Sequence, residues 1–166
     1  MRRLTEPDAL EEVKRNEKML KVYLDNCCYN RPFDSSNDEK VRMEAAAKLF
    51  IQSLIKYGDI LLVSSFVLYS EIVDNPFEYK RNSILCFVDH YAKKYIGSEV
   101  RSEVVTIADG IMKTGIKPVD ATHVACAILA DCDYFITTDN RLLKYKTGSI
   151  KLVNPIAFSR IWKEVT

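Results

Sequence analysis

The chain has 166 residues and a formal net charge of +1 at pH 7, so its length predicts a single domain. Its hydrophobic content of 48% is enough to build a sizeable core, but no continuous apolar stretch of about 18 residues indicates a membrane span. The charged N-terminus lacks the apolar segment of a signal peptide, so we expect a cytoplasmic protein. The balanced charge gives no global argument for nucleic-acid binding, although a local basic patch is compatible with it.

The cysteines do not indicate a structural role beyond packing. Their number is odd, two of them are adjacent, and no CxxC pair suggests a zinc site. We expect small buried thiols in a reducing compartment. The five positions are Cys27, Cys28, Cys86, Cys126 and Cys132.

The chain alternates between strand and helix patterns after a charged N-terminal segment. Residues 1–18 are predicted to form an extension, helical or flexible, before a domain over residues 19–166. In chain order the domain is predicted to contain a strand over 19–25, a loop to 36, a helix over 36–58, a strand over 59–65, helices over 65–75, 76–95, 97–115 and 117–132, a strand over 133–139, a short helix over 140–145, a strand over 149–154 and a helix over 155–165. Ser36 and Glu39 have the spacing of a capping box at the start of the first long helix. This alternation predicts an α/β fold with a parallel sheet and helices on both faces.

Four acidic residues stand where such a sheet places its ligands. Asp25 and Asp139 end the first and third predicted strands, and open α/β sheets bind ligands at the carboxyl ends of their strands. Asp120 lies in the first turn of a helix, and Glu71 lies in the helix after the second strand. Taken singly, each has an ordinary explanation as a turn former, a helix cap or a surface ion-pair partner.

The joint pattern of these acids favours a metal site. Four carboxylates in one cleft repel one another unless a cation holds them together. Oxygen ligands favour a hard ion such as Mg²⁺ or Mn²⁺. We therefore interpret Asp25, Glu71, Asp120 and Asp139 as catalytic residues and metal ligands.

The sequence resembles the PIN-domain nucleases over residues 20–158. The motifs that carry the resemblance are VYLDNCCYNRPFD, SFVLYSEIVDNP, KPVDATHVACAILADCDYFITTDNRLL and LVNPIAF, of which the third is the most specific. The four acids match the family's acidic positions. The resemblance implies a three-layer α/β/α sandwich with a central, mostly parallel sheet and metal-dependent cleavage of RNA.

The resemblance also implies partners. Many bacterial members of this size are similar to VapC-type toxins, which are usually homodimers neutralised by a small antitoxin protein. The loop NCCYNRPFD differs from that of the shortest toxins, which leaves the cellular role open.

Several further residues are expected to support the acids. Hydroxyl and amide groups adjacent to them, at Thr137, Thr138 and Asn26, are expected to orient a carboxylate or a metal-bound water. His123 shares a helix face with Asp120 and is either a general base or a packed core residue. Cations in the loops flanking the acids are candidates for binding RNA phosphates, namely Arg31, Lys117, Arg141 and Lys144.

Two other classes of protein compete with this interpretation. An inactive PIN-like binding module for nucleic acid or protein is the main alternative, but such a copy would be expected to lose one of the acids. A phosphatase with a nucleophilic aspartate after the first strand normally has a second acid two residues later, where this chain has Cys27.

Overall fold

The computed structural model describes residues 19–30 and 37–166. The predicted extension over residues 1–18 and the predicted RNA-binding residue Arg31 lie outside the described residues, so the domain boundary at residue 19 stays a prediction. In chain order the elements are β1 (Lys21–Leu24), α2 (Asn26–Asn30), α3 (Glu39–Lys56), β2 (Leu61–Ser65), α4 (Phe66–Val73), α5 (Glu78–Tyr91), β3 (Ala92–Ile96), η2 (Ser98–Val100), α6 (Arg101–Met112), α7 (Pro118–Leu129), β4 (Tyr134–Ile136), α8 (Asn140–Leu143), β5 (Lys151–Val153) and α9 (Pro155–Val165).

The strands form one sheet in the order β3-β2-β1-β4-β5, and all of its pairings are parallel. The chain builds outward from β1 to β2 and β3, then returns to add β4 and β5 on the other side of β1. The strand order therefore reverses between β1 and β4, and a sheet of this kind binds ligands at that point. This arrangement confirms the predicted α/β class with a parallel sheet.

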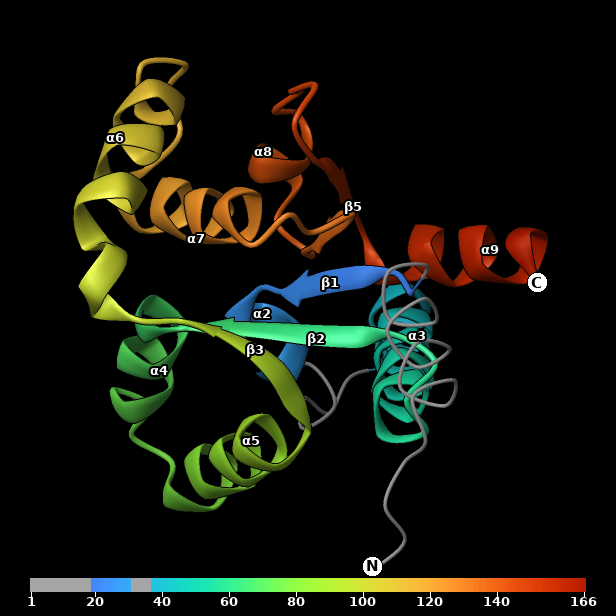
Figure 1. The fold of residues 1–166 in the computed structure, drawn as a ribbon. Helices are drawn as coiled ribbons and strands as arrows, with labels where there is room; N and C mark the ends of the chain where they lie inside the picture. Colours follow the sequence, from blue (N-terminus) through green and yellow to red (C-terminus); the bar gives the residue numbers. More distant parts are fainter. Residues whose placement is uncertain (1–18, 31–36) are drawn as a thin grey trace, which may run out of the picture.

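Helices cover both faces of the sheet (Figure 1). Side chains of β1 alternate between two hydrophobic clusters: Tyr23 faces α6 and α7, whereas Val22 and Leu24 face α3, α4 and α5. The sheet and the helices on its two faces form the predicted three-layer α/β/α sandwich (Figure 1).

Among the described residues, no helix is both long and apolar enough to cross a membrane.

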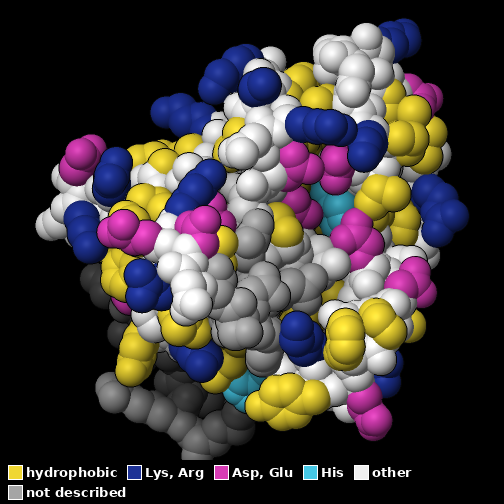
Figure 2. Space-filling model, turned by 180° about the vertical axis from the view of Figure 1, so that it is seen from behind, with side chains coloured by type: hydrophobic (Ala, Val, Ile, Leu, Met, Phe, Trp, Pro, Cys, Tyr) yellow, Lys and Arg dark blue, Asp and Glu magenta, His cyan; other side chains and the backbone are white. Residues whose placement is uncertain are grey.

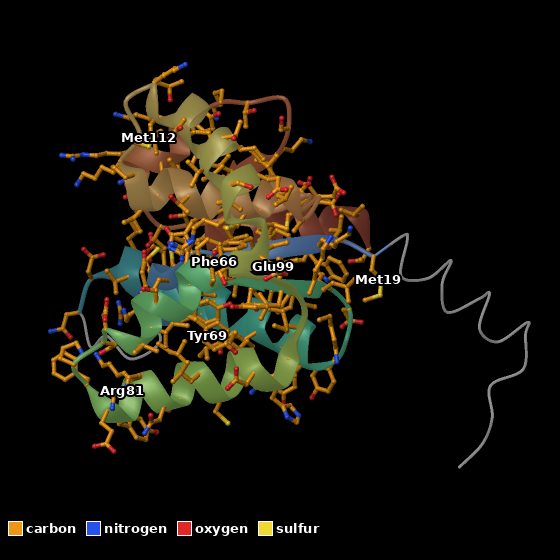
Figure 3. The ribbon with its side chains drawn as sticks, turned by 60° about the vertical axis from the view of Figure 1, so that its left-hand side comes forward. Met19, Phe66, Tyr69, Arg81, Glu99 and Met112 are labelled. Carbon is orange, nitrogen blue, oxygen red and sulfur yellow. The ribbon has the colours of Figure 1, made fainter. Side chains whose placement is uncertain are left out.

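The helix that carries Glu71, α4, is anchored by aromatic side chains on both sides of the sheet. Phe66 packs against the α6–α7 cluster, with the Arg101 guanidinium 5.1 Å from the centre of its ring. Tyr69 belongs to the opposite cluster and meets Tyr95 of β3 edge-on, with 5.8 Å between ring centres. Figure 3 labels Phe66 and Tyr69 on α4. These contacts fix the position of α4 relative to the sheet.

Three local predictions were wrong. Residues Asn26–Asn30 form the short helix α2 instead of a loop. The helix predicted to run to Tyr95 ends at Tyr91, and Ala92–Ile96 form the edge strand β3, paired with β2. The long helix α3 has Asp38 as its N-cap, which accepts hydrogen bonds from the backbone of Lys40 and Val41, whereas the predicted cap Ser36 lies outside the described residues.

Candidate functional site

Asp25 lies directly after β1 and is 8% exposed. Its Oδ2 accepts a hydrogen bond of 2.8 Å from the hydroxyl of Thr137, and its Oδ1 accepts one of 2.8 Å from the backbone N–H of Asn26. The thiol of Cys27 lies 3.5 Å from Oδ2. The desolvation of this carboxylate is thus partly offset by three donors, one just after β4 and two at the start of α2.

The segment after β4 brings the predicted Thr137 and Asp139 beside Asp25. Besides donating to Asp25, Thr137 Oγ1 accepts a 3.0 Å hydrogen bond from the backbone N–H of Asp139. Asp139 Oδ1 caps α8 by accepting from the backbone N–H groups of Arg141 and Leu142. Thr138 reaches the site through its backbone N–H, which lies 3.5 Å from Cys27 Sγ.

Glu71 projects from α4 to His123 of α7, with 2.7 Å between Oε1 and Nε2. Burial acts to raise the pKa of Glu71, but the hydrogen bond and electrostatic attraction of His123, helped by a hydrogen bond from Asn26, hold that pKa below its usual value. The other ring nitrogen, Nδ1, lies 2.6 Å from the hydroxyl of Tyr23. His123 is fully buried, as one of the two sequence interpretations expected, yet it also contacts a candidate site residue.

Asp120, in the first turn of α7, is repelled by the charges of the other three acids. Burial raises the pKa of its carboxyl, and repulsion from Asp25, Asp139 and Glu71 raises it further, against an opposing effect of His123. The other three predicted acids therefore lie within electrostatic reach of Asp120, at the carboxyl end of the sheet.

Two of the predicted cations lie beside these acids. Lys117 and Arg141 line a pocket of about 430 Å³ together with Asp120 and Asp139. Lys144, at the end of α8, is exposed and is not among the residues lining that pocket. Figure 2 shows acidic side chains gathered around a histidine, with Lys and Arg side chains along the rim. A site of this charge pattern suits a cation inside and a polyanion across the rim.

The donor set suits a hard divalent ion, although the acids are not drawn tightly together. Among residues 19–30 and 37–166, no three His, Cys, Asp or Glu side chains are close enough to form a metal-ligand group. Repulsion between like charges, which raises the pKa of Asp120, favours such a separation. Beside Asp25, the Oδ1 atom of Asn26 is buried without a hydrogen-bond partner among the described residues. An oxygen in that state next to carboxylates is a chemically suitable ligand for Mg²⁺ or Mn²⁺.

Sequence reasoning missed the part played by Cys27, which it treated as a packed thiol. A hydrogen bond from Cys28 lowers the pKa of Cys27 to about 7, with help from Thr138 and against burial and the charge of Asp25. Its Sγ lies 3.7 Å from Thr137 Oγ1. The available signal was its position two residues after Asp25 at the end of a strand.

Comparison with known proteins identifies the fold. No model of a protein family matches the chain, and no curated protein matches it. The structure of VapBC2 from Rickettsia felis, bound to a DNA fragment from its promoter, is 12% identical, with 81% of this chain and 98% of the matched chain covered at a TM-score of 0.52. The structure of FitAcB from Neisseria gonorrhoeae is 18% identical, with 81% and 97% covered at a TM-score of 0.50. These similarities, together with the parallel sheet, confirm the PIN-like fold predicted from the sequence.

Proposed function

We propose that this chain is a divalent-metal-dependent endoribonuclease that hydrolyses RNA phosphodiester bonds through its four carboxylates. The observation that carries the proposal is the electrostatic coupling of Asp120 to Asp25, Asp139 and Glu71 at the point where the strand order reverses. Like charges held this close repel one another unless a cation lies between them. A divalent cation bound for phosphodiester hydrolysis would offset this repulsion.

In this proposal the four acids hold Mg²⁺ or Mn²⁺, with Asn26 Oδ1 as a further oxygen beside them. A bound ion of this kind makes a coordinated water more acidic and stabilises the leaving oxygen of a phosphodiester. The chain's own hydrogen bonds set the geometry: Thr137 holds Oδ2 of Asp25, and His123 holds Oε1 of Glu71. Partners of this type orient the ligands and set their basicity.

Substrate binding in this proposal uses the cations around the acids. Lys117 and Arg141 line the same pocket as Asp120 and Asp139, which supports a role for these cations in neutralising phosphates. Arg31, which lies outside the described residues, and Lys144 remain predicted RNA contacts. Contacts with phosphate fix the position of the strand and do not select its sequence.

We also propose that the protein is the toxin of a toxin–antitoxin pair and forms a homodimer. VapBC2 and FitAcB, two of the similar structures, are each named for two components, which supports a small antitoxin as the partner of this chain. Light scattering on the purified protein tests the homodimer: a mass of twice 19.1 kDa is expected, and a monomer at all concentrations contradicts it.

The function is tested by RNA cleavage with wild type and the Asp120→Asn variant in Mn²⁺, Mg²⁺ and EDTA. We expect cleavage by wild type in either metal, none in EDTA, and a loss above about 100-fold in the variant, beyond the effect of losing an outer hydrogen-bond partner. Asp109→Asn, on the exposed side of α6, is the matched control and should cleave normally. RNA binding without cleavage under every condition would support the inactive binding module instead.

A further inference from the structure

A chain of hydrogen bonds runs from the start of α4 through the protein interior and returns to Glu71 on the same helix. The backbone N–H of Leu68 lies 3.1 Å from Ser65 Oγ, which is 2.6 Å from the Tyr23 hydroxyl. That hydroxyl is 2.6 Å from Nδ1 of His123, whose Nε2 is 2.7 Å from Glu71 Oε1. The side chains of Ser65, Tyr23 and His123 are fully buried.

The groups at the two ends of this hydrogen-bond network determine which atom donates each hydrogen bond. The amide of Leu68 only donates, so Ser65 Oγ accepts there and can give its own proton to Tyr23. Tyr23 can then donate to Nδ1 of His123, which leaves the ring proton on Nε2, facing the Glu71 carboxylate. The opposite tautomer would place a nitrogen lone pair 2.7 Å from a carboxylate oxygen, which is repulsive.

We propose that His123 is a positioning residue whose Nε2–H tautomer, fixed by Tyr23, holds Oε1 of Glu71 and so fixes the orientation of that carboxylate. The role of this orientation in metal binding rests on the proposed function, whereas the tautomer and its bond to Glu71 do not. A hydrogen-bond partner of this kind orients a ligating carboxylate and sets its basicity.

The hydrogen-bond chain links the elements that carry three of the four acids. Tyr23 belongs to β1, which is directly followed by Asp25, and His123 stands one turn after Asp120 on α7. Glu71 is on α4, whose N-cap is Ser65. A rotation of α4 or α7 would therefore break buried hydrogen bonds, and unsatisfied buried groups of this kind are unfavourable. These hydrogen bonds therefore fix the position of the Glu71 carboxylate relative to the other acids.

The tautomer is measured directly by nitrogen-15 NMR of the histidine rings, because protonated and unprotonated ring nitrogens have well-separated shifts. The chain has only two histidines, and the His90→Gln variant removes the signals of the other one. In the metal-free protein, at a pH where the ring is neutral, we expect the proton of His123 to lie on Nε2. A neutral ring with its proton on Nδ1 would overturn the proposal whether or not the protein is a nuclease.

The positioning role is measured by Mn²⁺ affinity, using electron paramagnetic resonance of free Mn²⁺. We expect affinity to fall about 10- to 100-fold in Tyr23→Phe and in His123→Leu, and His123→Gln, which keeps a donor near Nε2, to recover part of the loss. Tyr23→Phe retains the ring that stacks on Phe135 at 5.3 Å, so it remains informative if His123→Leu does not fold. Wild-type affinity in Tyr23→Phe would overturn the positioning role, whereas no Mn²⁺ binding by wild type would contradict the proposed function and leave the NMR result standing.

Discussion

The buried carboxylate of Asp25 depends on the hydroxyl of Thr137. Thr137 is itself fully buried and bridges Asp25 Oδ2 to the backbone of Asp139. Since Thr137 also orients a proposed metal ligand, this one side chain connects the stability of the fold with the proposed chemistry. Thr138, its neighbour in sequence, contacts Cys27 instead of a carboxylate.

Replacing Thr137 with valine should therefore destabilise the protein more than the same change at Thr138. We expect a loss of about 1–3 kcal/mol in the free energy of unfolding, because a buried charged acceptor loses its donor. Thr138→Val is the matched control and should lose clearly less. Urea denaturation of both variants measures the difference, and equal stabilities would contradict the role assigned to Thr137.

Asp120 should destabilise the metal-free protein at neutral pH. Burial and then repulsion from Asp25 and Asp139 raise the pKa of this carboxyl above its ordinary value of 3.8. The folded state thus binds the proton more tightly than the unfolded state, so stability falls as the pH rises from 3.8 through the raised pKa and stays reduced above it.

The Asp120→Asn variant should consequently be more stable than wild type in EDTA at pH 7. Solvent screens this partly exposed carboxyl, so we expect a gain of less than about 1 kcal/mol. The gain should vanish well below pH 3.8, where the carboxyl is protonated in both the folded and the unfolded state. Thermal unfolding across pH measures this, with Asp109→Asn as the control. A less stable variant at pH 7 would contradict the proposed repulsion among the acids.

Among the secondary-structure elements, α2 is a helix that contacts with neighbouring residues stabilise, despite its low helix propensity. Its residues Asn-Cys-Cys-Tyr-Asn are poor helix formers, which is why the sequence predicted a loop. The backbone of Asp25 accepts from the Cys28 N–H at 2.8 Å, and the buried Lys48 of α3 donates to the Cys27 carbonyl at 2.6 Å. The contact with Lys48 joins residues 21 apart, which no local sequence pattern connects.

Lys48→Met should loosen α2 and weaken metal binding together. Methionine is similar in length but donates no hydrogen bond to the Cys27 carbonyl, so we expect a loss of about 1–3 kcal/mol in stability. Because α2 carries Asn26 beside Asp25, Mn²⁺ affinity should fall as well. Lys56→Met, on the exposed end of the same helix, is the control. Unchanged Mn²⁺ affinity in Lys48→Met would show that the position of α2 does not affect metal binding.

The sequence predicted those elements whose local signals agree with the fold. The end of β1 just before Asp25 followed from an apolar run that stops at a polar residue, and α7 followed from Pro118 and the apolar face behind it. The predicted strand over 133–139 exists but is shorter, since β4 ends at Ile136. The edge strand β3 was missed because Lys93 and Lys94 interrupt any apolar run and continue the helical pattern of α5. Lysines are usual on an edge strand, where they discourage pairing with other chains.

Contacts between distant residues were beyond the reach of the sequence pattern. The hydrogen bond between Glu71 and His123 joins residues 52 apart, and nothing local to either residue indicates it. Spacing did show that His123 and Asp120 share a helix face, but the partner on α4 depends on how α4 and α7 pack across the end of the sheet.

For the whole molecule, topology explains how a nearly neutral chain makes a strongly charged site. The net charge is +1, yet the reversal of strand order gathers four acids at one end of the sheet and leaves Lys117 and Arg141 beside them. The similarity of this chain to VapBC2 and FitAcB lies in the fold, since the identity is only 12% and 18%.

The most direct test of the central claim is a Mn²⁺ titration of the wild-type protein and of Asp25→Asn, Glu71→Gln, Asp120→Asn and Asp139→Asn, followed by electron paramagnetic resonance, with Asp109→Asn as the control. If the four acids form one metal site, wild type and the control should bind Mn²⁺ with the same affinity, and each of the four variants should bind it more weakly. Equal binding by wild type and all four variants, or no binding by wild type, would contradict the account.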